Sequence, residues 1–383
     1  MEQECLPAGR HIFQIIGQKG TTAMSEYHIS RIHPSSRREI RQMEALLEKE
    51  GIRRDRNLDY SAGLFDDDYN LAATGSCFKN TLRCMAVDSS HQGEGLMNII
   101  VSHLMDYQYE RGILDLFLYT KCNTAKFFSD LGFYEIARVQ DRLVFMENRR
   151  TGFSDYLARL KKETEQSSAF QRSAGKDTGC LSGAVIMNAN PFTLGHQYLV
   201  ETAASMCGLL HVFVVSEEAS LVPFQVRKKL VQEGCSHLSN VVIHETGSYM
   251  ISNATFPSYF LKDDDTVIRS HAVLDIEIFK KIAAALGIST RFVGEEPFSQ
   301  VTNIYNQVMK EQLEYGGIAC HIIPRKANEA GIISASRVRQ MIHDGNMAGF
   351  RSAVPACTYD FFTSPEAEPV IRAVRETDQV VHY

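Results

Sequence analysis

The sequence predicts an α/β protein of two domains, the second of which is built on a doubly wound, mostly parallel sheet. Three observations lead to this fold class. Short apolar runs alternate with stretches of helical periodicity through the second half of the chain, as in a parallel sheet covered by helices. The apolar runs are continuous, which is typical of strands buried on both faces. The chain has 383 residues, 44% of them hydrophobic, and is long enough for two cores.

The most informative stretch is residues 183–200, which read GAVIMNANPFTLGHQYLV. An apolar run ends at a loop rich in Asn and Pro, and apolar residues then recur at helical spacing. We therefore expect a strand, a tight loop and a helix. The loop would lie at the carboxyl end of the strand, which is where open α/β sheets bind ligands.

The end of this loop has the chemistry of a phosphate site. Thr193 and His196 are three positions apart and share a face of the first helical turn. Gly195 has no side chain to keep a ligand away from the backbone. A helix start also offers free N–H groups and a positive dipole end. The alternative is a capping Thr and a surface His that merely begin a helix, and this short pattern does not separate the two.

A second helix start is expected far downstream, at residues 333–339. Ser334 is suited to the N-cap position, Ser336 and Arg339 lie three positions apart, and Arg337 adds another guanidinium group. Hydroxyl and guanidinium groups at a helix start could hold the far phosphates of a triphosphate. The alternative is an ordinary capped helix with a solvated Arg face.

Taken in this order, the two segments resemble the nucleotidylyltransferase superfamily, with its (H/T)-x-G-H loop and its I-S-S-T-x-x-R helix. The second motif reads I-S-A-S-R-V-R here, so Ser336 keeps the hydroxyl of the usual Thr. The resemblance implies that His196, Thr193 and Arg339 are catalytic. It implies ATP binding by Asn188, Asn190, Pro191, Phe192, Thr193, Gly195, His196, Gly294, Glu295, Ser334, Ser336, Arg337 and Arg339.

The first domain is expected over residues 24–150, and its order of elements resembles the GNAT-type acetyltransferase fold. In that fold a Q/R-x-x-G-x-G/A loop cradles the pyrophosphate of acetyl-CoA. Gln92 and Gly95 match the loop, and Met97 departs from it. The resemblance implies a site for a CoA-like arm, made by Gln92, Gly93, Gly95 and Asn123. Strands are expected at 60–65, 71–77, 81–87, 113–119, 133–139 and 143–146. Helices are expected at 96–109 and 124–131, and an earlier one is expected to start at residues 34–36 and to end at Gly51.

The two domains are expected to be joined by residues 151–180, as a helix over 151–163 and a polar linker over 164–178. The second domain then covers residues 181–383, and its part past Gly345 is expected to pack against the sheet edge. Residues 1–23 are expected to be weakly structured, with Met24 considered as an alternative start.

Four cations are candidates for contact with a substrate. Arg227 follows Pro223 on a helix whose basic residues are expected on the exposed side. Lys262 lies in an unusually aromatic segment. Arg325 and Lys326 come just before the second motif. The sequence does not decide which of the four reaches a ligand.

Composition excludes several other classes of function. The net charge of −6 gives no basic footprint for nucleic acid. Nine cysteines without C-x-x-C spacing favour a reduced cytoplasm, and thirteen histidines without H-E-x-x-H give no metal site. No apolar run reaches the ~20 residues that span a bilayer, and the amino terminus does not look like a secretory signal. We therefore expect a cytoplasmic protein with no nucleic-acid, membrane or resident metal partner.

The combination of a GNAT-like domain with an adenylylating domain resembles the citrate lyase ligase family. Four stretches carry the resemblance: NANPFTLGHQYLVE, ATFPSYFLK, RFVGEEPFSQVTNIYN and ISASRVRQMI. The resemblance implies that acetate and ATP give acetyl-AMP and pyrophosphate, with Mg²⁺ carried by ATP. It also implies that the acetyl group passes to the thiol of the phosphoribosyl-dephospho-CoA group on the citrate lyase acyl carrier subunit, which activates the lyase.

Three other interpretations are weighed against this one. An adenylyltransferase of coenzyme biosynthesis would act on a phosphopantetheine-like phosphate ester and would not need acetate. The GNAT-like half could instead be a CoA-sensing or docking module that regulates the other half. A protein N-acetyltransferase would consume acetyl-CoA without ATP.

Overall fold

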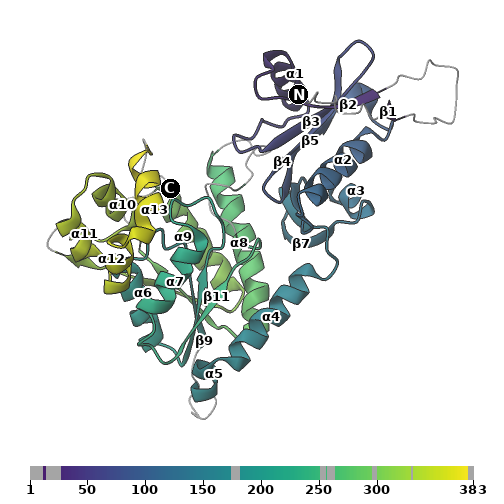
Figure 1. Ribbon diagram of the computed structural model, residues 1–383. Helices are drawn as coiled ribbons and strands as arrows, with labels where there is room; N and C mark the ends of the chain where they lie inside the picture. The colour runs from purple at the N-terminus through teal and green to yellow at the C-terminus, as the bar shows by residue number, and fades with distance from the viewer. Residues whose placement is uncertain are drawn as a thin grey trace. The chain divides into compact units, whose positions relative to one another are not determined.

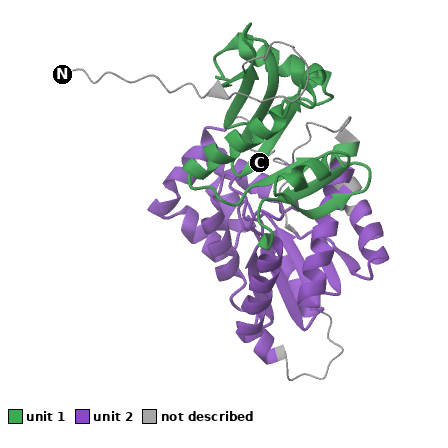
Figure 2. Ribbon diagram, turned by 90° about the vertical axis from the view of Figure 1, so that its right-hand side faces the viewer, with its two compact units in different colours: residues 1–152, 257–267 green, residues 153–256, 268–383 purple. Residues whose placement is uncertain are grey.

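The computed structural model describes residues 12–13, 27–173, 182–250, 256, 264–295, 300–328 and 331–377. The chain divides into two compact units (Figure 2). One is Met1–Gly152 with Pro257–Val267, and the other is Phe153–Phe256 with Ile268–Tyr383. Each unit has a large sheet of its own.

The first unit is built on an eight-stranded sheet with the order β1-β2-β3-β4-β5-β6-β8-β7 (Figure 1). Neighbouring strands are antiparallel except β5 and β6, which run parallel and pair only at Thr81–Phe117 and Leu82–Leu118. Beyond these pairs the two strands part, which leaves room for a ligand between their carboxyl ends. The strands are β1 Ile12–Phe13, β2 Tyr27–Arg31, β3 Tyr60–Phe65, β4 Leu71–Phe78, β5 Thr81–Val87, β6 Phe117–Thr120, β7 Tyr134–Val139 and β8 Leu143–Glu147.

Helices of the first unit form two apolar clusters with the sheet. Helix α1 buries Met43 and Leu47 against Phe65, and α2 buries Ile100 and Leu104 in a separate cluster. Each helix therefore packs in its cluster through one apolar stripe. The helices are α1 Arg37–Lys49, η1 Ser89–His91, α2 Leu96–Glu110 and α3 Ala125–Asp130.

The second unit is built on a five-stranded, fully parallel sheet with the order β11-β10-β9-β12-β13. The order reverses between β9 and β12, so the carboxyl ends of these strands mark the topological switch point. The predicted fold class, an α+β unit followed by a doubly wound parallel sheet, is confirmed. The strands are β9 Ser182–Met187, β10 Leu209–Val214, β11 Val241–Glu245, β12 Thr290–Gly294 and β13 Ala319–Ile323.

Helices cover this sheet and join its strands. Val185, Val212 and Phe292 lie in the core that the sheet shares with α6 and α7. The longest of the described helices is α8, which begins at Asp264. The helices between β8 and β13 are α4 Gly152–Gln166, α5 Ser168–Ser173, α6 Leu194–Ser205, α7 Phe224–Gly234, α8 Asp264–Leu286 and α9 Gln300–Tyr315.

The connecting stretch belongs to the second unit from Phe153 onward. The Tyr156 hydroxyl donates to the Glu245 carbonyl at 3.3 Å, and Leu160 is fully buried. The polar linker expected over 164–178 is helical at α5, where Ala169 packs with strand residues of β10 and β11. The Arg172 guanidinium also holds this helix by donating to the Ser239 carbonyl at 2.8 Å.

The chain past β13 forms a helical cluster of its own around Val338, Phe350 and Val374. Helix α12 packs on α7, and the Thr358 hydroxyl donates to the Phe192 carbonyl at 2.9 Å. This region therefore covers α7 and the loop after β9, and the expectation that it packs on the sheet edge is wrong. Its elements are β14 Ala327–Asn328, β15 Gly331–Ile332, α10 Ala335–His343, α11 Met347–Ala353, α12 Ala356–Phe362, η2 Pro365–Ala367 and α13 Glu368–Arg375.

Among the described helices, none combines the length and the apolar character that crossing a bilayer requires. The segments left out of the description include most of residues 1–23 and also Lys262.

Candidate functional site

The loop of residues 188–193 joins β9 to α6 at the carboxyl end of the sheet. Its Asn190–Pro191 peptide bond is cis. Phe192 is fully buried and its ring stacks on the imidazole of His196, with centroids 5.9 Å apart. Phe192 thus anchors the loop in the core of the second unit.

Helix α6 begins at Leu194, and Thr193 is its N-cap. The Thr193 hydroxyl accepts a hydrogen bond from the His196 backbone N–H at 3.3 Å, and the Thr193 backbone N–H donates to His196 Nδ1 at 3.1 Å. This is a reciprocal capping arrangement in which a His takes the place of the usual Glu or Gln. The two residues that the sequence pairs on one helical face are therefore in direct contact.

The imidazole of His196 is held in its neutral form. Burial, together with the positive charges of Arg325 and Arg339, lowers the pKa of His196 to about 4. Because Nδ1 accepts from the Thr193 N–H, the proton of the neutral ring belongs on Nε2. His196 can therefore act as a neutral hydrogen-bond donor through Nε2.

The two predicted helix starts meet at this point. A side-chain carbon placed on Gly195 would lie 2.9 Å from the Ile333 carbonyl oxygen, so only a glycine allows the backbones to approach this closely. The Arg339 guanidinium donates to the Asn190 carbonyl at 2.6 Å. Residues 149 positions apart in sequence thus converge on one loop.

Helix α10 presents hydroxyl and guanidinium groups beside that loop. Ser334 is its N-cap, with the side chain accepting from the Arg337 N–H at 3.3 Å. The Arg337 guanidinium donates to the Ile332 carbonyl, and the buried Arg339 also contacts the Ser336 hydroxyl at 3.4 Å. Burial lowers the pKa of Arg339 to about 10, so the group stays charged at neutral pH.

The carboxyl ends of β12 and β13 bring further predicted residues to the same edge of the sheet. Gly294 ends β12, and the next residue, Glu295, accepts from the Arg325 side chain through its carbonyl at 2.6 Å. The Lys326 ammonium lies over the ring of Tyr198 in α6, 5.8 Å from its centroid. Arg325 and Lys326 therefore lie near the start of α6, as two of the four substrate candidates.

The other two substrate candidates are Arg227 and Lys262. Arg227 is fully buried, so the expectation of a solvent-exposed side chain on α7 is wrong. Its guanidinium is directed at protein oxygens, among them both oxygens of Asn188. The Asn188 amide in turn donates to the Ser220 hydroxyl at 2.9 Å, so this side chain is engaged within the protein. Lys262 lies outside the described residues.

Together these groups make a positively charged site at the end of a parallel sheet. Two helix starts supply backbone N–H groups and positive dipole ends, and several cations lie close by. No group of three or more His, Cys, Asp or Glu side chains in the described chain could hold a metal ion. The arrangement is suited to binding a polyphosphate and to neutralising charge that develops on it.

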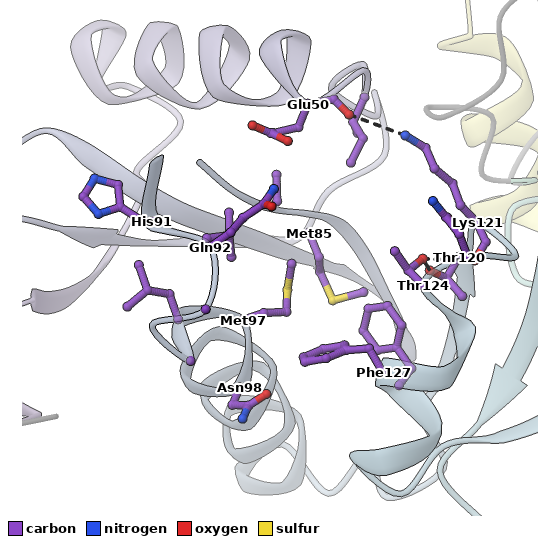
Figure 3. A pocket seen from close by; sticks show the side chains of 18 of the residues that line it. Glu50, Met85, His91, Gln92, Met97, Asn98, Thr120, Lys121, Thr124 and Phe127 are labelled. Atoms are coloured by element: carbon purple, nitrogen blue, oxygen red, sulfur yellow. Dashed lines mark hydrogen bonds between the residues drawn. The ribbon is translucent and has the colours of Figure 1, made fainter. Parts of the chain in front are cut away.

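A cavity of about 740 Å³ lies in the first unit, where β5 and β6 part (Figure 3). This volume is in the usual range of small-molecule sites. The four predicted residues of the loop and of the segment after β6 all line it: Gln92, Gly93, Gly95 and Asn123. Gly93 and Gly95 have φ angles of 91° and 77°, which glycine adopts readily, and Gly95 is the N-cap of α2.

The cavity lining is apolar in one part and polar in another. Met85, Met97 and Phe127 lie together, whereas Lys121 reaches the Glu50 carbonyl at 3.4 Å (Figure 3). Met97 is thus part of the lining. Glu50 and Lys121 also line the cavity and were not predicted from the sequence. Lys121 directly follows β6, and its position at the end of a predicted strand could have identified it as a candidate binding residue.

Comparison with known proteins gives the family of the chain. Residues 182–362 match the family model described as the citrate lyase ligase C-terminal domain. A [citrate [pro-3S]-lyase] ligase of Klebsiella pneumoniae is 42% identical over 296 residues, which are 76% of this chain and 83% of the relative. A ligase of the same name from Haemophilus influenzae is 35% identical over 83% of this chain and 93% of the relative.

The chain belongs to the citrate lyase ligase family. It is therefore an enzyme, and the resemblance drawn from the sequence motifs is confirmed. The relatives from Klebsiella pneumoniae, Haemophilus influenzae and Escherichia coli are all named as ligases of citrate (pro-3S)-lyase. Their alignments extend well beyond the C-terminal family model and reach into the first unit.

Two of the solved structures similar to the first unit are described as acyltransferases. A putative acyl-CoA N-acyltransferase of Klebsiella pneumoniae covers 32% of this chain and 95% of its own, with 17% identity and a TM-score of 0.27. A GNAT-family acetyltransferase of Staphylococcus aureus covers 32% and 99%, with 16% identity and a TM-score of 0.28.

Proposed function

We propose that this member of the citrate lyase ligase family is an ATP-dependent acetate ligase with two half-reactions. In the first, a carboxylate oxygen of acetate attacks the α-phosphorus of ATP, the bond to the bridging oxygen breaks, and pyrophosphate leaves. In the second, a thiol attacks the carbonyl carbon of acetyl-AMP and AMP leaves, with the thiol proton passing to solvent. The product is a thioester on the acyl carrier subunit of citrate lyase.

The first half-reaction belongs in this proposal to the second unit. Negative charge on the α-phosphate oxygens grows as acetate attacks, and His196 is poised to donate to them through Nε2 without carrying a charge itself. Thr193 sets the orientation of that ring through the cap. Transfer of this kind depends on positioning and charge neutralisation more than on a protein nucleophile.

The departing pyrophosphate would be held from the other helix start. The backbone N–H groups of α10 and the cations Arg325, Lys326 and Arg337 are candidates for this contact. Arg339 supports the loop carbonyl of Asn190 and adds its charge to the same site. Mg²⁺ would arrive on the phosphates of ATP, since the described residues offer no acidic cage for it, and would supply further charge neutralisation.

The second half-reaction is assigned in this proposal to an arm bound in the first unit. A phosphoribosyl-dephospho-CoA group carries a pyrophosphate and an extended pantetheine chain. The glycine loop at the start of α2 offers backbone N–H groups to the pyrophosphate. The apolar lining near Met85, Met97 and Phe127 would take the pantetheine chain.

The observation that carries the proposal is the meeting of two distant helix starts on one loop, at Gly195–Ile333 and Arg339–Asn190. The deciding experiment is ATP–pyrophosphate exchange with labelled pyrophosphate. Label should enter ATP only when acetate is present. Exchange that ignores acetate and requires phosphopantetheine would instead support the coenzyme-biosynthetic adenylyltransferase.

Substitution of the proposed donor is the first mutational test. His196→Ala should lower acetate-dependent exchange about a hundredfold or more, the scale of losing one preorganised oxyanion donor. The exposed His237 on the same unit gives a matched control, and His237→Ala should keep the wild-type rate. A near-normal rate for His196→Ala would show that the role given to His196 is wrong.

A further inference from the structure

The buried arginine of α7 makes an unusual number of contacts for one side chain. Arg227 is 0% exposed, and its guanidinium donates to five oxygen atoms at distances of 2.7–2.9 Å. The acceptors are Val222 O, Asn188 O, Asn188 Oδ1, Val215 O and Glu217 O. A group this fully used has little left with which to bind a substrate.

The five acceptors share a place in the fold. Asn188 is the first residue after β9, Val215 is the first residue after β10, and Val222 immediately precedes the cap of α7. One guanidinium therefore joins the carboxyl ends of two neighbouring strands to the start of a helix. The planar fork of an arginine can bond several oxygens at fixed angles, which the ammonium of a lysine cannot do.

The loop of residues 188–193 depends on this contact at its first residue. It is held at Asn190 from two further directions, by the Val222 N–H at 3.0 Å and by Arg339 at 2.6 Å. The loop then ends at Thr193, whose N–H bonds to Nδ1 of His196. The orientation of His196 is therefore mechanically linked to the anchor at the start of the loop.

We propose that Arg227 is a positioning residue for the adenylylation step: it fixes the loop of residues 188–193, and through it Thr193 and His196, without touching the substrate. The inference rests on the function proposed above for the same site. It differs from the sequence-based expectation, in which this cation contacts the substrate directly.

The test compares Arg227→Lys and Arg227→Met with Lys229→Met, which changes an exposed cation on the same helix. Hydrogen–deuterium exchange of the backbone amides in 188–196 reports the loop, and acetate-dependent ATP–pyrophosphate exchange gives kcat and KM. Misplacing catalytic groups by about 1 Å costs roughly a hundredfold in rate. For the two Arg227 variants we expect faster amide exchange in the loop and a kcat about a hundredfold lower, because the catalytic groups are misplaced. The KM for ATP should stay within about threefold of wild type, because Arg227 does not touch the substrate.

Each outcome decides the proposal. Unchanged amide exchange in Arg227→Lys would overturn the anchoring role. Faster amide exchange with a wild-type kcat would overturn the positioning role, and so would a raised KM for ATP with kcat preserved, which indicates substrate contact. Arg227→Lys keeps a buried cation and serves if Arg227→Met does not fold. If the wild-type chain shows no acetate-dependent ATP–pyrophosphate exchange, the proposed function is refuted. Hydrogen–deuterium exchange of the loop amides would still test whether Arg227 anchors the loop.

Discussion

At the scale of single residues, one side chain serves both to begin a helix and to set the chemistry of the site. Thr193 and Ser334 are N-caps in the structure, which is the plainer of the two alternatives that the sequence left open. The caps do not exclude a phosphate site, because a capped helix still presents other free N–H groups at its start. In α6 the cap also fixes the tautomer of His196, so local structure and proposed chemistry depend on the same contact.

The burial of the two arginines could not be predicted at this scale. Helical spacing placed Arg227 beside two lysines, and only contacts with residues up to 39 positions away show that it is buried. Arg339 was selected as a charged residue of the motif, yet its carbonyl partner at Asn190 is 149 positions distant. Sequence spacing specifies a helix face, but it does not tell which oxygens other segments bring to that face.

The lowered pKa of His196 gives a prediction about stability and pH. The pKa in the folded chain is about 4, below the usual 6.5 of the unfolded chain. The unfolded chain therefore binds more protons between these values, and the folded state loses stability as pH falls from 6.5 towards 4. His196→Gln removes this contribution, so the variant should lose less stability over that window than the wild type does.

Urea denaturation of both chains at pH 7 and at pH 4.5 measures this difference. The buried His211, whose pKa is lowered to about 3 by burial and then by His244, gives a loss in the same direction in both chains and cancels in the comparison. Equal losses in the two chains would mean that His196 is not held neutral by its surroundings.

At the scale of elements, the alternation of apolar runs and helical stretches was enough to predict most strands and helices. Strands β3 and β5 begin and end where the sequence placed them, because their apolar runs are bounded by turn residues. The stretch after α4 was less predictable. Its polar composition indicated a linker, whereas the structure has a helix there, with Ala169 buried against two strands.

The packing of α6 against the segment before α10 gives a prediction at this scale. By helix propensity alone, Gly195→Ala would stabilise a helix by up to about 1 kcal/mol. The added methyl would lie 2.9 Å from the Ile333 carbonyl oxygen, and overpacking of this kind costs roughly 1–3 kcal/mol. We therefore expect Gly195→Ala to lower the free energy of unfolding, against its propensity.

Chemical denaturation of Gly195→Ala and of Ser205→Ala, an exposed substitution at the other end of α6, makes the comparison. The rate of acetate-dependent ATP–pyrophosphate exchange should fall in Gly195→Ala and stay at the wild-type value in Ser205→Ala. A Gly195→Ala chain as stable as wild type would show that the two helix starts can separate without cost.

At the scale of the whole molecule, each unit has its own sheet, its own core and its own candidate site. The proposed reaction also has two separable steps, one on a nucleotide and one on a thiol. A chain with this organisation can divide the steps between its units. A regulatory first unit, the rival interpretation, would instead alter the rate of the nucleotide step when removed.

A fragment of residues 153–383 separates these possibilities, because it keeps α4, whose Tyr156 and Leu160 are buried in the second unit. We expect the fragment to retain acetate-dependent ATP–pyrophosphate exchange at close to the rate of the full chain, because the groups proposed for acetyl-AMP formation all belong to it. Acetylation of the thiol of dephospho-CoA, used as a probe for the arm, should fall towards the uncatalysed rate, since the cavity between β5 and β6 is absent. If the fragment loses both the exchange reaction and thiol acetylation, the first unit has a part in the nucleotide step. If the fragment acetylates the thiol at the full rate, the cavity has no part in the reaction.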